Sequence, residues 1–147
     1  MKILALNKKA KLDYHILKNY EAGLVLFGPE VKSAKLDQIS LKGSYVTLKN
    51  SELWLLNCHI SPYKKAHQIK YEPTRSRKLL LHRKEIDSLL GKLKQGLTLI
   101  PLRVYTKKGL IKLEIGLCRG KRKYEKRELI KKQEAGRQIQ RALREKP

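Results

Sequence analysis

Short apolar runs separated by turn-forming residues recur along the first 120 positions of the chain. Runs of this length, bounded by glycine or polar clusters, are typical of β-strands, whereas amphipathic helices need longer segments with apolar groups three and four positions apart. The pattern therefore predicts a protein built mainly from strands. The predicted strands cover residues 21–28, 45–49, 53–60, 97–105 and 110–118.

Two pairs of these strands lie close enough in the sequence to form hairpins. The first pair flanks residues 49–52, and the second flanks residues 106–109, in which Gly109 supplies the positive φ that a tight turn needs. Within residues 110–115 apolar and polar side chains partly alternate, which is typical of a strand with one face toward water. The sheet is therefore predicted to be antiparallel.

Two segments have the spacing of helices. Residues 81–93 carry apolar side chains at helical intervals, and Gly96 stands where it can cap the helix end. Residues 29–35 predict a shorter helix, with Pro29 in the first turn, where a missing N–H does no harm.

Five or more strands with two or three short helices indicate a small antiparallel β-barrel. An OB-like barrel is the version that also binds RNA, although strand count alone does not separate it from an SH3-like barrel.

Two further segments lack periodicity. Residues 61–78 are rich in basic side chains and predict a mobile basic loop. Residues 121–147 hold eleven basic and four acidic side chains, a net charge of +7, with only a thin apolar stripe that Gly136 weakens. We therefore expect one folded domain over residues 1–120 and a basic tail over residues 121–147 that is disordered until it is bound.

The charge of the chain indicates its partner. Lysine and arginine number 35 against 13 aspartate and glutamate residues, a formal net charge of +22 on 147 residues. A body with so much like charge attracts polyanions, and nucleic acid is the leading candidate. Tyr63 and Tyr124 stand in basic, non-periodic stretches, where a ring can stack on an unpaired base beside a phosphate contact.

The sequence offers little material for catalysis or metal binding. It contains no nucleophile elbow, phosphate-cradling glycine loop or HExxH motif. Cys58 and Cys118 stand sixty positions apart without a close partner, so they are predicted to be reduced core residues in strands. We predict no enzyme activity, no cofactor and no metal. No apolar run approaches the roughly 20 residues that span a bilayer, so we expect a cytoplasmic protein without membrane contact.

Eight short blocks spread along nearly the whole chain have an order and spacing that are specific when taken together. They are LNKKA (6–10), YEAG (20–23), GPEVKS (28–33), SYV (44–46), ISPY (60–63), PTRSRKLLL (73–81), GLTLIPL (96–102) and IGLCRGK (115–121). In these blocks the chain resembles the small protein B (SmpB) family, the SsrA-binding proteins that accompany transfer-messenger RNA in bacterial trans-translation.

The resemblance implies an OB-type barrel that binds the transfer-RNA-like domain of transfer-messenger RNA and helps deliver it to stalled ribosomes. It further implies that the tail occupies the decoding centre of the small subunit and the empty mRNA channel. Elongation factor Tu with GTP is implied as an indirect partner, and the free protein as a monomer. The family's RNA-contact positions correspond to Asn7, Glu21, Leu80 and Lys112, and its tail motif to Gly120, Arg122, Tyr124, Glu125, Lys126 and Arg127.

The chemistry of these side chains leaves some roles open. Asn7 can donate and accept hydrogen bonds, and Lys112 is a point charge for phosphate. Glu21 repels phosphate, so it either accepts a hydrogen bond from a base amino group or a 2′-hydroxyl, or it orients a neighbouring basic side chain. Leu80 either contacts RNA or packs in the core. Tyr124 can stack on a base but carries no positive charge, unlike the histidine of some members.

Two other classes of function compete with this interpretation. A ribosomal or ribosome-assembly OB-fold protein that binds rRNA would have the same combination of barrel and basic tail. A small ribonuclease would need two of the four histidines to meet in space as acid and base. The order of the eight blocks favours the SmpB-like function over both.

Overall fold

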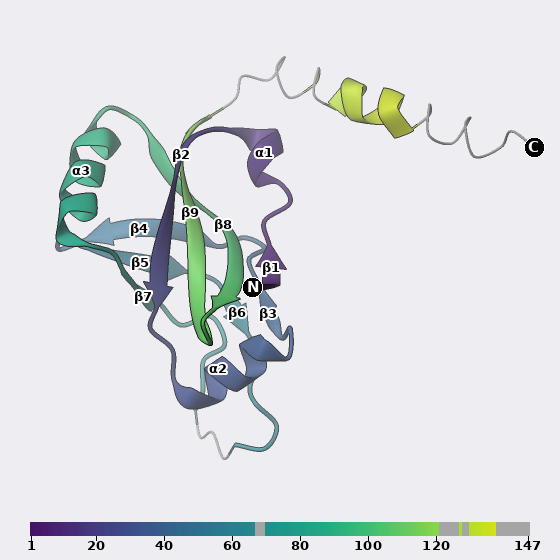
Figure 1. The fold of residues 1–147 in the computed structure, drawn as a ribbon, viewed down its shortest axis with the longest axis vertical. Coiled ribbons are helices and arrows are strands. Elements are labelled where there is room, and N and C mark those ends of the chain that lie inside the picture. The colour runs from purple at the N-terminus through teal and green to yellow at the C-terminus, as the bar shows by residue number, and fades with distance from the viewer. Residues whose placement is uncertain (67–69, 121–126, 128–129, 138–147) are drawn as a thin grey trace, which may run out of the picture.

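The computed structural model describes residues 1–66, 70–120, 127 and 130–137. Short helices join antiparallel strands in this part of the chain, and the strands wrap around one core (Figure 1). The elements are β1 (Lys2–Leu6), α1 (Ala10–Asp13), β2 (Tyr14–Leu24), α2 (Gly28–Lys35), β3 (Ile39–Ser40), β4 (Tyr45–Lys49), β5 (Glu52–Leu56), β6 (His59–Ile60), β7 (Arg77–Leu80), α3 (Arg83–Lys94), β8 (Thr98–Lys107) and β9 (Leu110–Gly120).

The strands form one large sheet and one small sheet. The large sheet has the order β1-β8-β9-β2-β7-β5-β4, and the small sheet pairs β3 with β6. Every pairing in both sheets is antiparallel, as predicted. Strand β4, at one end of the large sheet, also lies close to β8 near the other end, so the sheet curls around the core.

Both predicted hairpins are confirmed, and each turns on two residues with positive φ. Lys49 pairs with Glu52 across Asn50 and Ser51, whose φ angles are 52° and 60°. In the second hairpin Lys107 pairs with Leu110 across Lys108 (φ 51°) and Gly109 (φ 77°). Positive φ at both central residues matches the twist of the flanking strands. The tight turns therefore fix the register of both strand pairs.

Other strand boundaries differ from the prediction. The predicted strand over residues 53–60 is interrupted, because β5 ends at Leu56 and Asn57 takes a φ of 60° that turns the chain before β6. The predicted strand over residues 21–28 is displaced, since β2 begins at Tyr14 and ends at Leu24. Strands β1, β3 and β7 and helix α1 were not predicted from the sequence.

Both predicted helices are present. Helix α3 spans Arg83–Lys94, and Gly96 follows it with a φ of 86°, so its backbone N–H reaches the carbonyl of Leu93 at 3.2 Å. Helix α2 begins at Gly28, with Pro29 in its first turn. Leu89 of α3 is fully buried, whereas most of this helix is partly or fully exposed. Helix α3 therefore covers the sheet with one apolar face.

The core lies on the inner face of the curled sheet. Its buried members come from nearly every strand and include Leu53, Leu55, Leu79, Val104, Leu113 and Ile115. Cys58 and Cys118 are both completely buried, although only Cys118 lies in a strand. Burial raises the pKa of each thiol to about 11, so both stay protonated and unreactive at neutral pH.

The prediction of a mobile loop over residues 61–78 is wrong for residues 71–77, and residues 67–69 of that loop lie outside the described residues. Arg77 is fully buried and forms an ion pair with Glu30 of α2, whose side chain is also fully buried. The Arg77 guanidinium donates to the carbonyl of Pro73 at 2.9 Å, and Tyr71 donates to the carbonyl of Ile60 at 2.9 Å. These buried bonds hold the segment against α2 and β6 although it has no hydrophobic periodicity.

The last strand of the described residues ends at the predicted boundary with the basic tail. Strand β9 ends at Gly120, the last residue of the predicted domain. Residues 130–137 are helical and all exposed, and Figure 1 shows this helix apart from the sheet. Among the described residues no helix is long and apolar enough to cross a membrane.

Candidate nucleic-acid interface

The outer face of β8, β9 and β2 is the polar side of the large sheet. Strand alternation turns Val104, Leu113 and Ala22 into the core and sends their neighbours to the opposite face. The neighbours include a basic side chain on each of β8 and β9 and a carboxylate on each of β9 and β2. The polar face consists of Arg103, Tyr105 and Lys107 on β8, Lys112 and Glu114 on β9, and Asn19 and Glu21 on β2.

Two carboxylates stand directly opposite each other on this face. Glu21 and Glu114 are cross-strand partners in the β2–β9 ladder, an arrangement in which like charges destabilise a sheet. Glu114 is neutralised by Arg103, whose Nε lies 2.9 Å from Glu114 Oε2, and Asn19 Nδ2 donates to Glu114 Oε1 at 3.4 Å. Glu21 needs separate partners, because Arg103 and Asn19 are engaged by Glu114.

The partners of Glu21 come from β8. The hydroxyl of Tyr105 donates to Glu21 Oε2 at 2.5 Å, and Lys107 Nζ lies 3.4 Å from each carboxylate oxygen. The Tyr105 bond, opposed by partial desolvation and helped by Lys107 and Lys112, holds the pKa of Glu21 below its ordinary value. Glu21 is therefore a carboxylate at neutral pH, and its side chain is 39% exposed.

Gly23 brings the other two predicted contact residues together. Gly23 pairs with Lys112 on one side and with Leu80 on the other, so both side chains emerge on the same face as Glu21. A Cβ at Gly23 would lie 3.3 Å from Leu80 Cβ, so the glycine leaves the space that Leu80 occupies. Leu80 is 54% exposed, whereas Leu79 is buried. Core packing is therefore not the role of Leu80.

Asn7 lies at the other end of the same face. Its Nδ2 donates to the carbonyl of Pro101 at 2.9 Å, and its backbone N–H donates to the carbonyl of Leu102. It lines a cavity of about 440 Å³ together with Asn19, Arg103 and Glu114. A second cavity, lined by Glu21 and Tyr105, shares those last three residues. The two cavities adjoin at these shared residues, and together we call them the groove, which has Asn7 at one end and Glu21 at the other.

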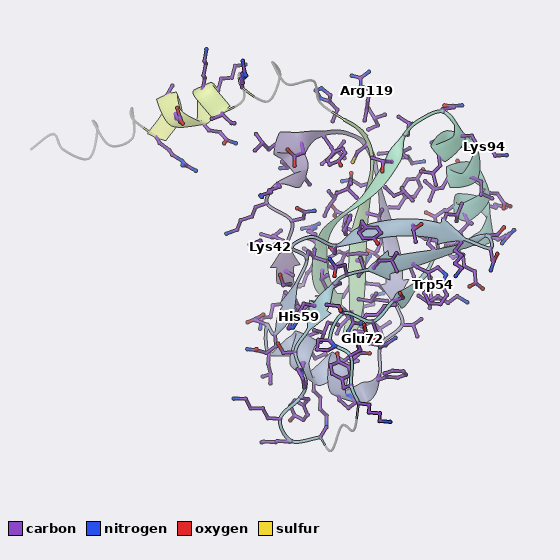
Figure 2. All side chains as sticks on the ribbon, turned by 180° about the vertical axis from the view of Figure 1, so that it is seen from behind. Lys42, Trp54, His59, Glu72, Lys94 and Arg119 are labelled. Atoms are coloured by element: carbon purple, nitrogen blue, oxygen red, sulfur yellow. The ribbon has the colours of Figure 1, made fainter. Side chains whose placement is uncertain are left out.

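Basic side chains continue beyond Asn7. Lys8, Lys9 and Lys42 line a cavity of about 500 Å³ beside it, between the β1–α1 loop and the β3–β4 turn. Figure 2, seen from behind, shows Lys42, Lys94 and Arg119 projecting from separate parts of the body. Basic side chains therefore lie both beside the groove and on other parts of the body.

The structure places only part of the predicted tail motif. Gly120 is the last residue of β9, is exposed and pairs with Tyr14, and Arg127 is helical and exposed. Arg122, Tyr124, Glu125 and Lys126 lie outside the described residues. Their predicted role in the decoding centre remains a prediction.

Sequence reasoning missed the residues that arrange the groove. Arg103, Tyr105 and Lys107 alternate with Val104 and Thr106, and the period of two along a strand places the first three side chains on one face. The pattern was available in the sequence, but the pairing of Tyr105 with Glu21 was not, because 84 positions separate the two residues. Tyr63, a predicted stacking residue, is half-buried, with Lys32 Nζ 5.5 Å from the centre of its ring.

Comparison with known proteins identifies the family. The family model described as SmpB protein matches residues 4–145. The chain belongs to the SmpB family. Among its relatives, the SsrA-binding protein of Carboxydothermus hydrogenoformans is 51% identical and that of a Sulfurihydrogenibium species is 53% identical, and each alignment covers at least 96% of both chains. Relatives of the SmpB family are thus matched over almost their whole length.

A solved structure shows the same fold. A chain from the work entitled "tmRNA-SmpB: a journey to the center of the bacterial ribosome" superposes with a TM-score of 0.66 at 42% sequence identity. The match covers 85% of this chain and 92% of the other. The mainly antiparallel fold with a few short helices is therefore that of an SmpB protein.

Proposed function

We propose that this chain binds the transfer-RNA-like domain of transfer-messenger RNA and helps deliver it to stalled ribosomes for trans-translation. Membership of the SmpB family and the solved relative from a transfer-messenger RNA and ribosome study support the proposal. The observation that carries it is the outer face of β8, β9 and β2, where Asn7 and Glu21 line the groove and Leu80 and Lys112 flank Gly23.

Each of the four side chains offers a different contact to RNA. Lys112 supplies a charge for a phosphate, and Asn7 keeps its side-chain oxygen as an acceptor while its nitrogen bonds Pro101. Exposed Leu80 supplies an apolar surface for a base or sugar. Glu21 supplies a fixed acceptor, which only a donor group of the RNA can approach. A surface with two carboxylates, Glu21 and Glu114, among its basic side chains selects against simple phosphate binding.

The tail supplies the second half of the proposed function. Its +7 net charge and thin apolar stripe suit it to the phosphate-lined decoding centre and the empty mRNA channel, where rRNA contacts offset the entropy of ordering. We also propose that the free chain is a monomer in the cytoplasm and that it meets elongation factor Tu with GTP only through the RNA. A role as a structural ribosomal protein is not favoured by the family match.

A binding measurement tests the first half of the proposal. Fluorescence anisotropy with a labelled transfer-RNA-like domain is expected to give tight binding by residues 1–120, which hold +15 of the net charge. Affinity for an unrelated hairpin RNA of equal length, the matched control, should be much lower at physiological salt. Both affinities should fall with salt through counterion release. Equal affinity for the two RNAs at physiological salt would refute specific recognition.

A further inference from the structure

Tyr105 donates a hydrogen bond to Glu21, yet it is not among the RNA-contact positions that the family resemblance implies. Tyr105 lies on β8, which neighbours β9 but is separated from β2 by it, so its hydroxyl crosses over β9 to reach Glu21. Tyr105 is 3% exposed, with Arg103 stacked 5.1 Å from the centre of its ring. The tyrosine side chain is therefore fixed, and the direction of its hydroxyl is fixed with it.

We propose that Tyr105 is a positioning residue for RNA recognition, which holds Glu21 as an acceptor for a hydrogen-bond donor of the RNA, a base amino group or a 2′-hydroxyl. This inference rests on the proposed function of the groove. The hydroxyl occupies one lone pair of Glu21 Oε2, and the carboxylate has further lone pairs on both oxygens. With a side chain that is 39% exposed, Glu21 can be approached from solvent.

A neutral donor suits this task better than a close ion pair. Lys107 lies 3.4 Å from both oxygens and is 52% exposed, so it is a loose partner. Burial, reinforced by the Glu21 carboxylate, raises the pKa of Tyr105, so the hydroxyl stays protonated and always donates. Tyr105 thus orients the carboxylate without cancelling its charge, and the opposing Glu114 is already satisfied by Arg103.

Fixed geometry affects recognition through entropy. A free glutamate side chain loses rotamer freedom when it meets RNA, whereas a glutamate that is already hydrogen-bonded has lost that freedom in the free protein. The charged and titratable residues that line the Glu21 cavity or act on its carboxylate are Tyr20 on β2, Arg103, Tyr105 and Lys107 on β8, Lys112 and Glu114 on β9, and Met1 with its amino terminus.

A double-mutant cycle tests the inference on the full chain. Tyr105→Phe, which removes only the hydroxyl, is expected to weaken binding to the labelled transfer-RNA-like domain about 10-fold, as for one hydrogen bond to a charged group. Glu21→Ala should weaken it at least as much, and the double variant should bind no more weakly than Glu21→Ala. Tyr45→Phe, which removes an exposed hydroxyl on β4, is the matched control and should bind like the wild type.

A titration separates positioning from a general structural effect. Carboxyl NMR of Glu21 in the free protein should show its pKa rising in Tyr105→Phe toward the ordinary glutamate value, because the bond that lowers it has been removed. The acid limb of RNA binding should move to higher pH by the same amount. Thermal melting of Tyr105→Phe should stay close to that of the wild type.

Distinct results overturn the inference and the proposed function. The positioning role would be overturned if Tyr105→Phe bound the RNA with wild-type affinity. It would also be overturned if Tyr105→Phe reduced RNA affinity by the same factor in the Glu21→Ala background as in the wild type. An unchanged pKa of Glu21 in Tyr105→Phe would overturn the geometry itself. If the wild type failed to prefer the transfer-RNA-like domain over the unrelated hairpin, the proposed function would fall, and the titration would still decide whether Tyr105 holds Glu21.

Discussion

The buried pair of Glu30 and Arg77 makes the strongest prediction about stability. Glu30 accepts hydrogen bonds from the backbone N–H of Phe27 at 2.9 Å, from Arg77 Nε at 2.8 Å and from Arg75. Arg77 also donates to the carbonyls of Cys58 and Pro73. The pair therefore joins α2 to the segment before β7 and to the turn between β5 and β6.

Replacing Glu30 with glutamine leaves Arg77 as a buried charge without its counterion. Removing one partner of a buried ion pair typically costs about 3–5 kcal/mol. The total free energy of unfolding of a domain is about 5–15 kcal/mol, so the loss is a large part of it. The matched control is Glu52→Gln, because the Glu52–Lys78 pair at 3.3 Å is about half exposed and such pairs contribute about 0–1 kcal/mol.

Urea unfolding measures both variants, with the only tryptophan, Trp54 on β5, as the fluorescent probe. Glu30→Gln should move the urea midpoint far below that of the wild type, and Glu52→Gln should barely move it. If Glu30→Gln unfolded at the same urea concentration as Glu52→Gln, the assigned importance of the buried pair would be wrong.

The pH dependence of the same pair has a definite sign. Burial alone would raise the pKa of Glu30, but hydrogen bonds from Arg75, Phe27 and Arg77 outweigh it and lower the pKa. A carboxyl whose pKa is lower in the folded state than in the unfolded state stabilises the fold at any pH above its unfolded pKa of about 4.3. This stabilisation is lost as the pH falls through the pKa of the folded state. The wild-type advantage over Glu30→Gln should therefore shrink in acid. A constant difference down to strongly acidic pH would contradict the sign.

Three substitutions on the outer face of β8, β9 and β2 test the RNA contacts. Gly23→Val should displace Leu80 and weaken RNA binding about 5-fold, which corresponds to about 1 kcal/mol of binding free energy. Unchanged affinity would show that RNA binding does not depend on the position of Leu80. Lys112→Ala should reduce the salt slope of binding by about one, and an unchanged slope would exclude a phosphate contact. Asn7→Ala should lower the free energy of unfolding by about 1 kcal/mol, because the hydrogen bond to Pro101 is lost, in addition to any loss of RNA affinity. A melting temperature equal to that of the wild type would show that this bond does not stabilise the fold.

Local sequence patterns predicted the parts of the fold that local forces determine. The turns at residues 49–52 and 106–109 and helix α3 depend on neighbouring residues, and each lies where the pattern places it. Strand β7 was missed because Arg77, a charged residue, occupies a core position that an apolar side chain normally fills. Nothing in the sequence near Arg77 indicates that Glu30, 47 positions away, neutralises it.

The four candidate contact residues were predictable, but their arrangement and the residues that position them were not. Asn7, Glu21, Leu80 and Lys112 came from resemblance to the family, and only the sheet register shows that Gly23 places Leu80 and Lys112 on one face. The choice between core and surface for Leu80 was open in the sequence, because the Leu79-Leu80-Leu81 run gives no alternation. The partners of Glu21 required knowledge of β8 and β9 together.

Trans-translation in a reconstituted system tests the central claim most directly. The assay combines the full chain, or residues 1–120, with transfer-messenger RNA, elongation factor Tu and GTP, and purified ribosomes that have stalled at the end of an mRNA. It measures the addition of the tag to the stalled peptide. The full chain is predicted to support tagging, and residues 1–120 are predicted to bind the RNA with similar affinity but to give no tag. Full tagging by the truncated chain would contradict the role of the tail, and no tagging by the full chain would contradict the function itself.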